Sequence, residues 1–215
     1  MTQIEQTLQL LHEVGILRPH ELAAHGLSPV ALYALYRQGK VIRTGRGLYL
    51  LPDTELTEHH SLAEACKRVP HGVVCLLSAL RFHNIGTQNP FEVWLAIDHK
   101  ARRPQVDYPP LRIVRFSGAA LSDGIEEQQI EGVTVRVYTL AKTVADCFKY
   151  RHKIGLDVAL EALRECLAAR YCTHQELWHY AKICRVSNVM QPYLEAMIDT
   201  HSKPPSGKPF LSATG

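Results

Sequence analysis

Three glycines divide the first 52 residues of the chain into short segments, and this division constrains the fold more than any other feature. Gly15, Gly26 and Gly39 each follow residues with apolar positions at helical spacing. Glycine commonly follows the last turn of a helix because it adopts the left-handed backbone conformation without a steric penalty. The segments before these glycines therefore predict three helices, at residues 4–14, 19–25 and 28–38.

The third helix has a clear start, and a hairpin is predicted to follow it. Ser28 can cap the free backbone N–H groups, and Pro29 suits the first helical position, where its missing N–H costs nothing. Leu32, Leu35 and Tyr36 are expected to face inward. Two β-prone runs then follow around a loop with two glycines, at residues 40–43 and 48–51. Three helices before a β-hairpin are typical of a winged helix-turn-helix domain, which we place at residues 1–52.

Charge is unevenly distributed, although the net formal charge of +3 is small. Residues 1–52 contain five Lys/Arg and three Asp/Glu, and no acidic residue lies between 22 and 52. Residues 53–200 contain 17 basic and 18 acidic residues, so that part is balanced. A locally basic winged helix next to a balanced remainder favours an anionic partner, and double-stranded DNA is the partner we expect.

The predicted fold assigns roles within the basic segment. The third helix would enter the major groove with its N-terminal residues toward base edges, while Lys40 and Arg43 flank the wing and Arg46 lies at its tip. The wing cations would bind phosphates or enter the minor groove. We expect DNA contacts from these residues: Ser28, Val30, Ala31, Tyr33, Ala34, Arg37, Lys40, Arg43 and Arg46.

This surface has few side chains suited to bidentate base recognition, since Asn and Gln are missing from its outward positions. One copy is therefore expected to have weak sequence specificity, and a tight site would need repeated or dimeric binding. The alternative is a winged helix that contacts only protein, and the charge pattern disfavours it.

The remainder of the chain predicts a mixed α+β domain at residues 53–200 with a helical C-terminal half. Helices are expected at 57–69 and 78–85, and strands at 72–76, 91–97, 111–116, 125–130 and 133–137. From Thr139 onward the pattern is helical, and Leu156, Leu160, Leu163 and Leu167 suggest the inward stripe of one helix. The tail, residues 201–215, is expected to be disordered.

Composition excludes several classes of protein. With 46% hydrophobic and 21% charged residues, the 215-residue chain is not intrinsically disordered as a whole. It has neither a long apolar run for a membrane span nor a signal-peptide pattern at its start, so we expect a cytoplasmic protein with no membrane partner. The six cysteines have no zinc or redox spacing, and six free thiols are expected.

The sequence offers little evidence of catalysis, so we expect a protein that is not an enzyme and needs no cofactor or metal. Phosphate-loop, nucleophile-elbow and HExxH motifs are missing, and the 12 histidines are scattered. The one enzymatic alternative is a metal-dependent nuclease that uses Asp98 and Lys100 after a strand. That site needs a further carboxylate, and Glu92 lies about 20 Å away along the strand.

Several arginines of the second domain remain open to two interpretations. They form either an ordinary solvated face balanced by acids, or a surface for nucleic acid or an acidic partner. These residues are Arg81, Arg102, Arg103, Arg112 and Arg115.

A series of short motifs, in order along the chain, resembles the AbiEi antitoxins. The motifs are GRGLY at 45–49, HSLAEA at 60–65, VCLLSAL at 74–80 with His83, VYTLAKTVAD at 137–146 and KYR at 149–151. The resemblance covers residues 1–200 and implies an antitoxin of a type IV toxin–antitoxin system, active in abortive infection and phage defence. It implies that the winged helix represses the protein's own operon.

The same resemblance implies that the second domain counters a nucleotidyltransferase-like toxin without needing a stable complex with it. It implies no catalytic residues. A second form of this interpretation is a stand-alone winged-helix transcriptional regulator without a toxin partner.

Overall fold

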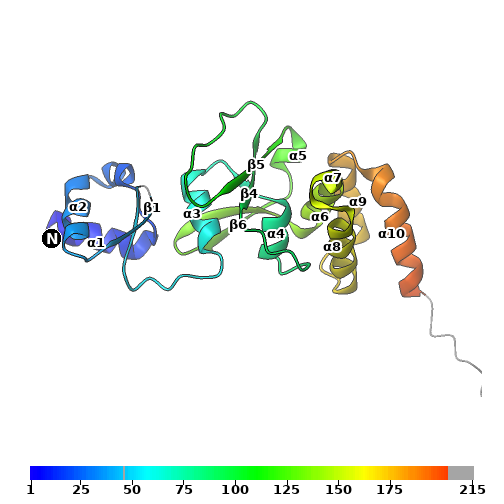
Figure 1. Ribbon diagram of the computed structural model, residues 1–215, viewed down its shortest axis with the longest axis horizontal. Coiled ribbons are helices and arrows are strands. Elements are labelled where there is room, and N and C mark those ends of the chain that lie inside the picture. Colours follow the sequence, from blue (N-terminus) through cyan, green and yellow to red (C-terminus); the bar gives the residue numbers. More distant parts are fainter. Residues whose placement is uncertain (46, 203–215) are drawn as a thin grey trace, which may run out of the picture.

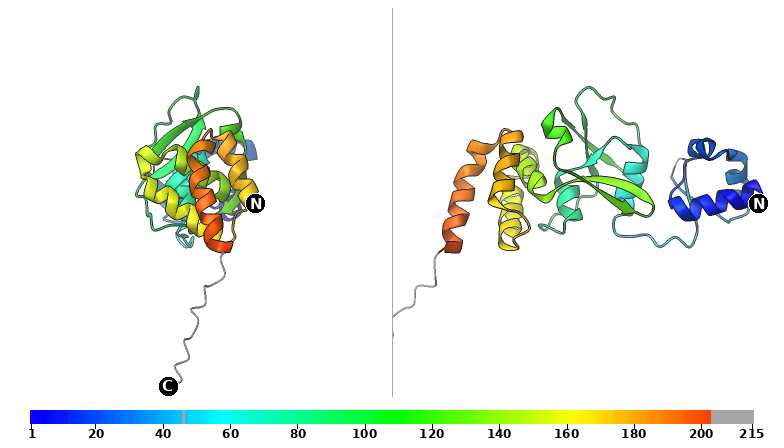
Figure 2. Two further views of the ribbon diagram at one scale, coloured as in Figure 1. Left: turned by 90° about the vertical axis from the view of Figure 1, so that its right-hand side faces the viewer. Right: turned by 180° about the vertical axis from the view of Figure 1, so that it is seen from behind.

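The computed structural model describes residues 1–45 and 47–202. Its elements lie in three parts along one long axis, namely an N-terminal group of helices with a hairpin, a central sheet, and a group of C-terminal helices (Figures 1 and 2). We call residues 1–52 the head and the described residues after them the body. The body combines a mixed sheet with helices, so the predicted α+β fold class is confirmed.

The head contains the predicted order of elements. They are α1 (Gln3–Val14), the 3₁₀ helix η1 (Pro19–His25), α2 (Pro29–Arg37), β1 (Ile42–Gly45) and β2 (Leu48–Leu50). A capping box of Thr2 and Glu5 starts α1, and Ser28 starts α2 by accepting a hydrogen bond from the Val30 N–H at 3.2 Å. The strands β1 and β2 pair antiparallel, with Arg43 opposite Tyr49. The winged helix-turn-helix order predicted from the breaker glycines is confirmed.

The body is built on a five-stranded sheet in the order β5-β4-β3-β7-β6. Its strands are β3 (Val73–Val74), β4 (Val93–Asp98), β5 (Leu111–Phe116), β6 (Ile125–Ile130) and β7 (Val133–Tyr138). The pairs β3–β4 and β6–β7 are antiparallel, whereas β4–β5 and β3–β7 are parallel. The predicted hairpin of β6 and β7 turns at Glu131 and Gly132, which both have positive φ.

Helices cover both faces of this sheet. The helices of the body are α3 (His60–Arg68), α4 (Leu76–Phe82), α5 (Ala119–Ser122), α6 (Leu140–Lys149), α7 (Arg151–Ile154), α8 (Leu156–Ala168), α9 (His174–Ile183) and α10 (Ser187–Ser202). Successive residues of a strand point to opposite faces, so β4 places Leu95 in the core under α3 and Trp94 in the core under the C-terminal helices. The sheet therefore separates two hydrophobic cores.

Three details of the C-terminal part differ from the prediction. The buried stripe of α8 is formed by Val158, Ala159, Ala162, Leu163 and Cys166, whereas Leu156 is exposed. Cys166 and Cys172 form a disulfide, so the expectation of six free thiols is wrong for these two, and the other four are free and buried. The helix α10 extends to Ser202, past the predicted start of the tail, and residues 203–215 lie outside the described part of the chain.

The head contacts the body through a small interface with apolar and polar parts. Ile16 and Leu48 of the head pack into the body core under α3. Gly15 and Gly132 bring the end of α1 against the β6–β7 turn so closely that a side chain at either position would collide with backbone atoms. The Lys67 ammonium lies 2.9 Å from the Glu21 carboxylate across the same interface.

Hydrogen bonds hold the segment that links head and body at the point where it enters the body. The Glu131 carboxylate accepts hydrogen bonds from the Thr57 N–H at 2.8 Å and the Thr57 hydroxyl at 2.9 Å, and it lies 2.6 Å from the His60 ring nitrogen Nδ1. Because these groups belong to the β6–β7 turn and to the start of α3, they fix the segment that arrives from the head. Within residues 1–45 and 47–202, no helix is long and apolar enough to span a bilayer.

Candidate nucleic-acid interface

The exposed face of α2 is the centre of the candidate interface. Val30, Tyr33 and Arg37 follow one another at spacings of three and four residues, which places them on one side of a helix. Val30 is 71% exposed and Tyr33 is 43% exposed. Ala34 is half-buried on the same side. The opposite side of α2, with Leu32 and Leu35, is buried in the core of the head.

Two predictions about this helix are wrong. Ala31 was expected among the DNA contacts, but it is only 6% exposed because it lies on the buried side with Leu32 and Leu35. Tyr36 was expected to face inward, but it is 46% exposed, and its ring packs against Tyr49 as the Tyr33 ring does. Sequence reasoning missed Tyr36 because an amphipathic tyrosine fits either side of a short helix. Its position three residues after Tyr33 was the signal for the outer face.

A buried tyrosine of the wing supports the two exposed rings. The Tyr49 ring contacts the Tyr36 ring edge-on at a centroid distance of 5.8 Å and the Tyr33 ring at 6.3 Å. Burial raises the pKa of Tyr49, while the nearby Arg43 guanidinium opposes that rise. Tyr49 thus stays neutral at physiological pH and connects the exposed face of α2 to the hairpin.

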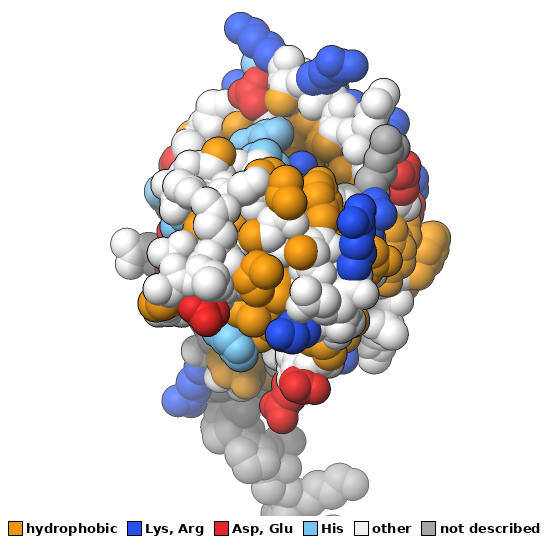
Figure 3. Space-filling model, turned by 90° about the vertical axis from the view of Figure 1, so that its left-hand side faces the viewer, with side chains coloured by type: hydrophobic (Ala, Val, Ile, Leu, Met, Phe, Trp, Pro, Cys, Tyr) orange, Lys and Arg blue, Asp and Glu red, His pale blue; other side chains and the backbone are white. Residues whose placement is uncertain are grey.

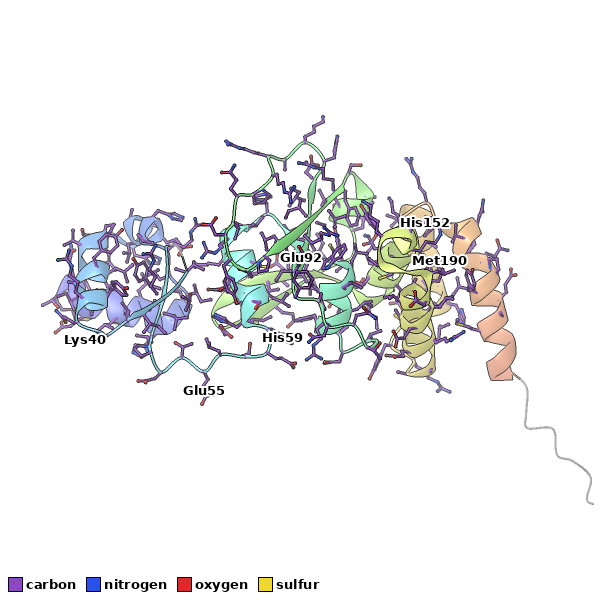
Figure 4. The ribbon with its side chains drawn as sticks, viewed as in Figure 1. Lys40, Glu55, His59, Glu92, His152 and Met190 are labelled. Atoms are coloured by element: carbon purple, nitrogen blue, oxygen red, sulfur yellow. A yellow bond between two sulfur atoms is a disulfide. The ribbon has the colours of Figure 1, made fainter. Side chains whose placement is uncertain are left out.

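All the Lys and Arg side chains that were predicted to contact DNA, and that the structure describes, are exposed to solvent. Arg37, Lys40 and Arg43 are exposed, and Lys40 is labelled on the head in Figure 4. The Arg43 Nε donates to the Gly45 carbonyl at 3.1 Å, which holds the guanidinium against the wing while its other nitrogens remain available. Arg46 lies outside the described residues. Ser28 is half-buried, and its hydroxyl can still donate to a ligand while its oxygen caps α2.

The wing is positioned by the body as well as by α2. Gly45 lies directly against the Arg68 guanidinium of α3, and a side chain at position 45 would displace that guanidinium. In Figure 1, β1 lies between α2 and the body, and α2 lies at the far end of the head. Figure 3 shows this end of the molecule, with hydrophobic side chains near its centre and Lys and Arg side chains at several points around them. The surface therefore combines apolar contact area with positive charge.

The enzymatic alternative finds little support in the structure. The Asp98 carboxylate accepts a hydrogen bond from the backbone N–H of Lys100 at 2.8 Å, so it closes the turn after β4. The Glu92 carboxylate lies 3.8 Å from Arg112 and pairs with that residue instead. In the described part of the chain, no three His, Cys, Asp or Glu side chains are grouped so that they could hold a metal ion. The carboxylate pair that a nuclease of this kind requires is therefore not assembled around Asp98.

The exposed α2, its cations and the hairpin define the class of the head, which is a winged helix-turn-helix of the kind that binds DNA. Residues 5–52 match the family model described as "Transcriptional regulator, AbiEi antitoxin". The AbiEi family predicted from the motifs is thus confirmed over the head.

The fold as a whole is similar to that in the crystal structure of the RV2827C protein from Mycobacterium tuberculosis. The TM-score is 0.57 at 13% sequence identity, with 93% of this chain and 81% of that chain covered. At this identity the likeness shows the fold alone. No curated protein matches the chain.

Proposed function

We propose that the protein is a DNA-binding repressor of its own operon and the antitoxin of a type IV toxin–antitoxin system. One observation carries the DNA-binding part of this proposal. The exposed face of Val30, Tyr33 and Arg37 lies on the helix that winged helices insert into the major groove, and no carboxylate occurs between residues 22 and 52. The match of the head to antitoxin transcriptional regulators supports the same function.

Binding would proceed in two physical steps. Coulomb attraction to the phosphates first draws the basic head to the duplex, and counterions released from the DNA supply most of the sequence-independent affinity. Val30 and Tyr33 on the exposed face of α2 then contact base edges, while Arg37 and the wing cations contact phosphates and fix the orientation on the backbone. The proposed DNA-contacting residues are Ser28, Val30, Tyr33, Ala34, Tyr36, Arg37, Lys40 and Arg43, with Arg46 retained as a prediction.

The decisive experiment measures duplex affinity against salt concentration. A fluorescent duplex from the region upstream of the protein's own gene is titrated with the full chain and with the double variant Arg37→Gln, Arg43→Gln. Each lost phosphate contact reduces the magnitude of the slope of log affinity against log salt by about 0.9. The slope of the double variant should therefore be smaller in magnitude by about 1.8. At 0.15 M salt, this change corresponds to roughly 30-fold weaker binding.

The matched control removes two exposed cations elsewhere. Arg164 of α8 and Lys182 of α9 are exposed and far from the head in sequence, so Arg164→Gln, Lys182→Gln changes net charge equally. This control should bind the duplex like the parent protein. If both double variants lose affinity equally, net charge alone governs binding and the proposed interface is wrong. Failure of the parent protein to bind its upstream duplex would overturn the repressor function.

In the antitoxin part of the proposal, the body of the protein neutralises a nucleotidyltransferase-like toxin. Neutralisation takes place in the cytoplasm and does not require a stable complex. It rests on the family match of the head and on a non-enzymatic interpretation of the body. The test is co-expression with the protein encoded by the adjacent reading frame. The full chain should restore growth. When both proteins are expressed from a foreign promoter, the double variant Arg37→Gln, Arg43→Gln should restore growth equally well. If the parent chain does not restore growth, the antitoxin function is wrong and the protein is a stand-alone regulator.

A further inference from the structure

A second cationic surface lies on the body, at the free edge of the sheet. A hollow of about 510 Å³ lies between β5, which is the edge strand, and α7. Its charged and aromatic lining residues are Trp94, Arg103, Arg112, Arg115, Tyr150 and Lys153, and its other lining residues are apolar. We call this the β5–α7 hollow. Among the residues that the structure describes, its lining contains four cations and no carboxylate, although the body as a whole is balanced in charge.

One of the four cations organises the hollow from within. The Arg115 guanidinium nitrogen Nη1 donates to the backbone carbonyls of His99 at 2.7 Å, Ala101 at 2.9 Å and Asp98 at 3.3 Å. These bonds hold the residues that follow β4 against β5. Arg103 comes shortly after these residues in the chain. Arg115 therefore builds the wall of the hollow, and Arg103, Arg112 and Lys153 remain to meet a ligand.

Aromatic rings hold two of the remaining cations in place. The Arg112 guanidinium lies 5.4 Å from the centre of the Trp94 ring, and the Lys153 ammonium lies 5.4 Å from the centre of the Tyr150 ring. Tyr150 in turn packs against Phe116 of β5 at a centroid distance of 5.7 Å. Because the rings belong to the folded core, they restrict where these two cations can lie. Arg112 also meets Glu92 at 3.8 Å through Nε, which leaves its outer nitrogens available.

We propose that the β5–α7 hollow binds single-stranded nucleic acid, with Arg103, Arg112 and Lys153 on its phosphates. Its volume is within the range of small-ligand sites, so it takes about one or two nucleotides of a strand and has no room for a duplex. Open cationic surfaces with interleaved aromatic rings are how proteins bind single strands without sequence preference. A base can stack on the plane of the Arg112 guanidinium or beside the half-buried Tyr150 ring.

This site is separate from the DNA-binding face of the head. Figure 4 labels His152, the neighbour of Lys153 on α7, on the opposite part of the molecule from Lys40. In Figure 1, the central sheet lies between the head and α7. The β5–α7 hollow and the head can therefore be altered independently.

The test uses the full chain and a fluorescent 12-nucleotide oligo(dT), with oligo(U) as a second probe to distinguish DNA from RNA. Two nucleotides in the hollow present three phosphates, one at each end and one between them, which predicts a slope of log affinity against log salt of about −2. The variant Arg103→Gln, Lys153→Gln should bind either probe about tenfold more weakly at 0.15 M salt, with the slope reduced to about −0.7. Its melting temperature and duplex affinity should equal those of the parent protein.

Three results would overturn the proposal. The first is equal loss of probe binding in the matched control Arg164→Gln, Lys182→Gln, which would show that net charge alone attracts the strand. The second is competition by poly-glutamate as effective as that by unlabelled oligo(dT), which would make the site a general polyanion surface. The third is competition by thymidine monophosphate that equals oligo(dT) at the same nucleotide concentration, which would make the ligand a mononucleotide.

Discussion

Arg37 on the head and Arg112 on the body are both exposed cations near aromatic rings, but the rings play different parts. On the head, Tyr33 and Tyr36 are themselves exposed and rest on the buried Tyr49. On the body, Trp94 is buried and lies beneath the Arg112 guanidinium. The head therefore offers apolar area together with charge, whereas the body offers charge whose position is restricted by rings.

This difference indicates what each surface can discriminate. Exposed apolar groups can contact base edges in a major groove, including the methyl group of thymine. Cations held on buried rings contact mainly phosphates, which are the same in every sequence. We therefore expect the head to distinguish sequences and the β5–α7 hollow to distinguish strand form. If the two surfaces depend on separate parts of the structure, damage to one should leave binding at the other unchanged.

The largest effect is expected beneath the β5–α7 hollow. The Lys142 ammonium is fully buried, 2.6 Å from the Asp146 carboxylate and 4.8 Å from the centre of the Phe116 ring. Burial raises the pKa of Asp146, and the Lys142 charge opposes that rise. Replacing Asp146 by Ala leaves an uncompensated buried charge, so unfolding free energy in urea should fall by about 3–5 kcal/mol.

The control for Asp146→Ala removes both charges. The double variant Lys142→Met, Asp146→Leu keeps the volume apolar and should regain most of the lost stability, because a buried ion pair is often no better than a hydrophobic pair. Equal destabilisation of the single and double variants would show that packing, and not the unpaired ammonium, causes the loss.

An intermediate effect is expected from the ring that supports the head surface. Replacing Tyr49 by Leu removes the edge contacts to Tyr33 and Tyr36, and such contacts are worth about 0.5–1.5 kcal/mol each. We expect unfolding free energy to fall by about 2 kcal/mol and duplex affinity to fall with it, while binding of oligo(dT) is unchanged. The variant Tyr49→Phe keeps the ring and should behave as the parent. A loss of oligo(dT) binding in Tyr49→Leu would contradict the separation of the two surfaces.

The order of the head was predictable because its signals are local. Helix ends are determined by the residues next to them, here by Gly15, Gly26 and Gly39, and the start of α2 is determined by Ser28 and Pro29. The helices therefore have the order that these residues predict. The inward and outward sides of α2 were predicted less well. Ala31 is small enough for either side and is buried with Leu32 and Leu35, whereas the amphipathic Tyr36 packs on the Tyr49 ring of β2.

The β5–α7 hollow was beyond sequence reasoning for a different reason. Arg103, Arg112 and Arg115 were visible as candidates, but Lys153 joins them only through the packing of α7 beside the edge strand. The close approach of Gly15 to Gly132 likewise joins segments more than 100 residues apart in the sequence. Such contacts depend on the topology of the sheet, which no local pattern specifies.

The smallest predicted effect tests the apolar character of the head surface most directly. The upstream duplex is amplified with dUTP in place of dTTP, which removes the thymine methyl groups and leaves every hydrogen-bonding group unchanged. If Val30 and Tyr33 contact these methyl groups, each contacted methyl contributes about 0.8 kcal/mol, so affinity should fall about fourfold per contact.

The identity of the contacting side chain follows from two variants of α2. In Val30→Ala the difference between the thymine and uracil duplexes should shrink, because part of the apolar surface is gone. In Arg37→Gln both duplexes should bind more weakly by the same factor, because a phosphate contact does not sense the methyl group. Equal affinity of the parent protein for the two duplexes would show that its exposed apolar face does not read thymine, while binding itself would still support a role in repression.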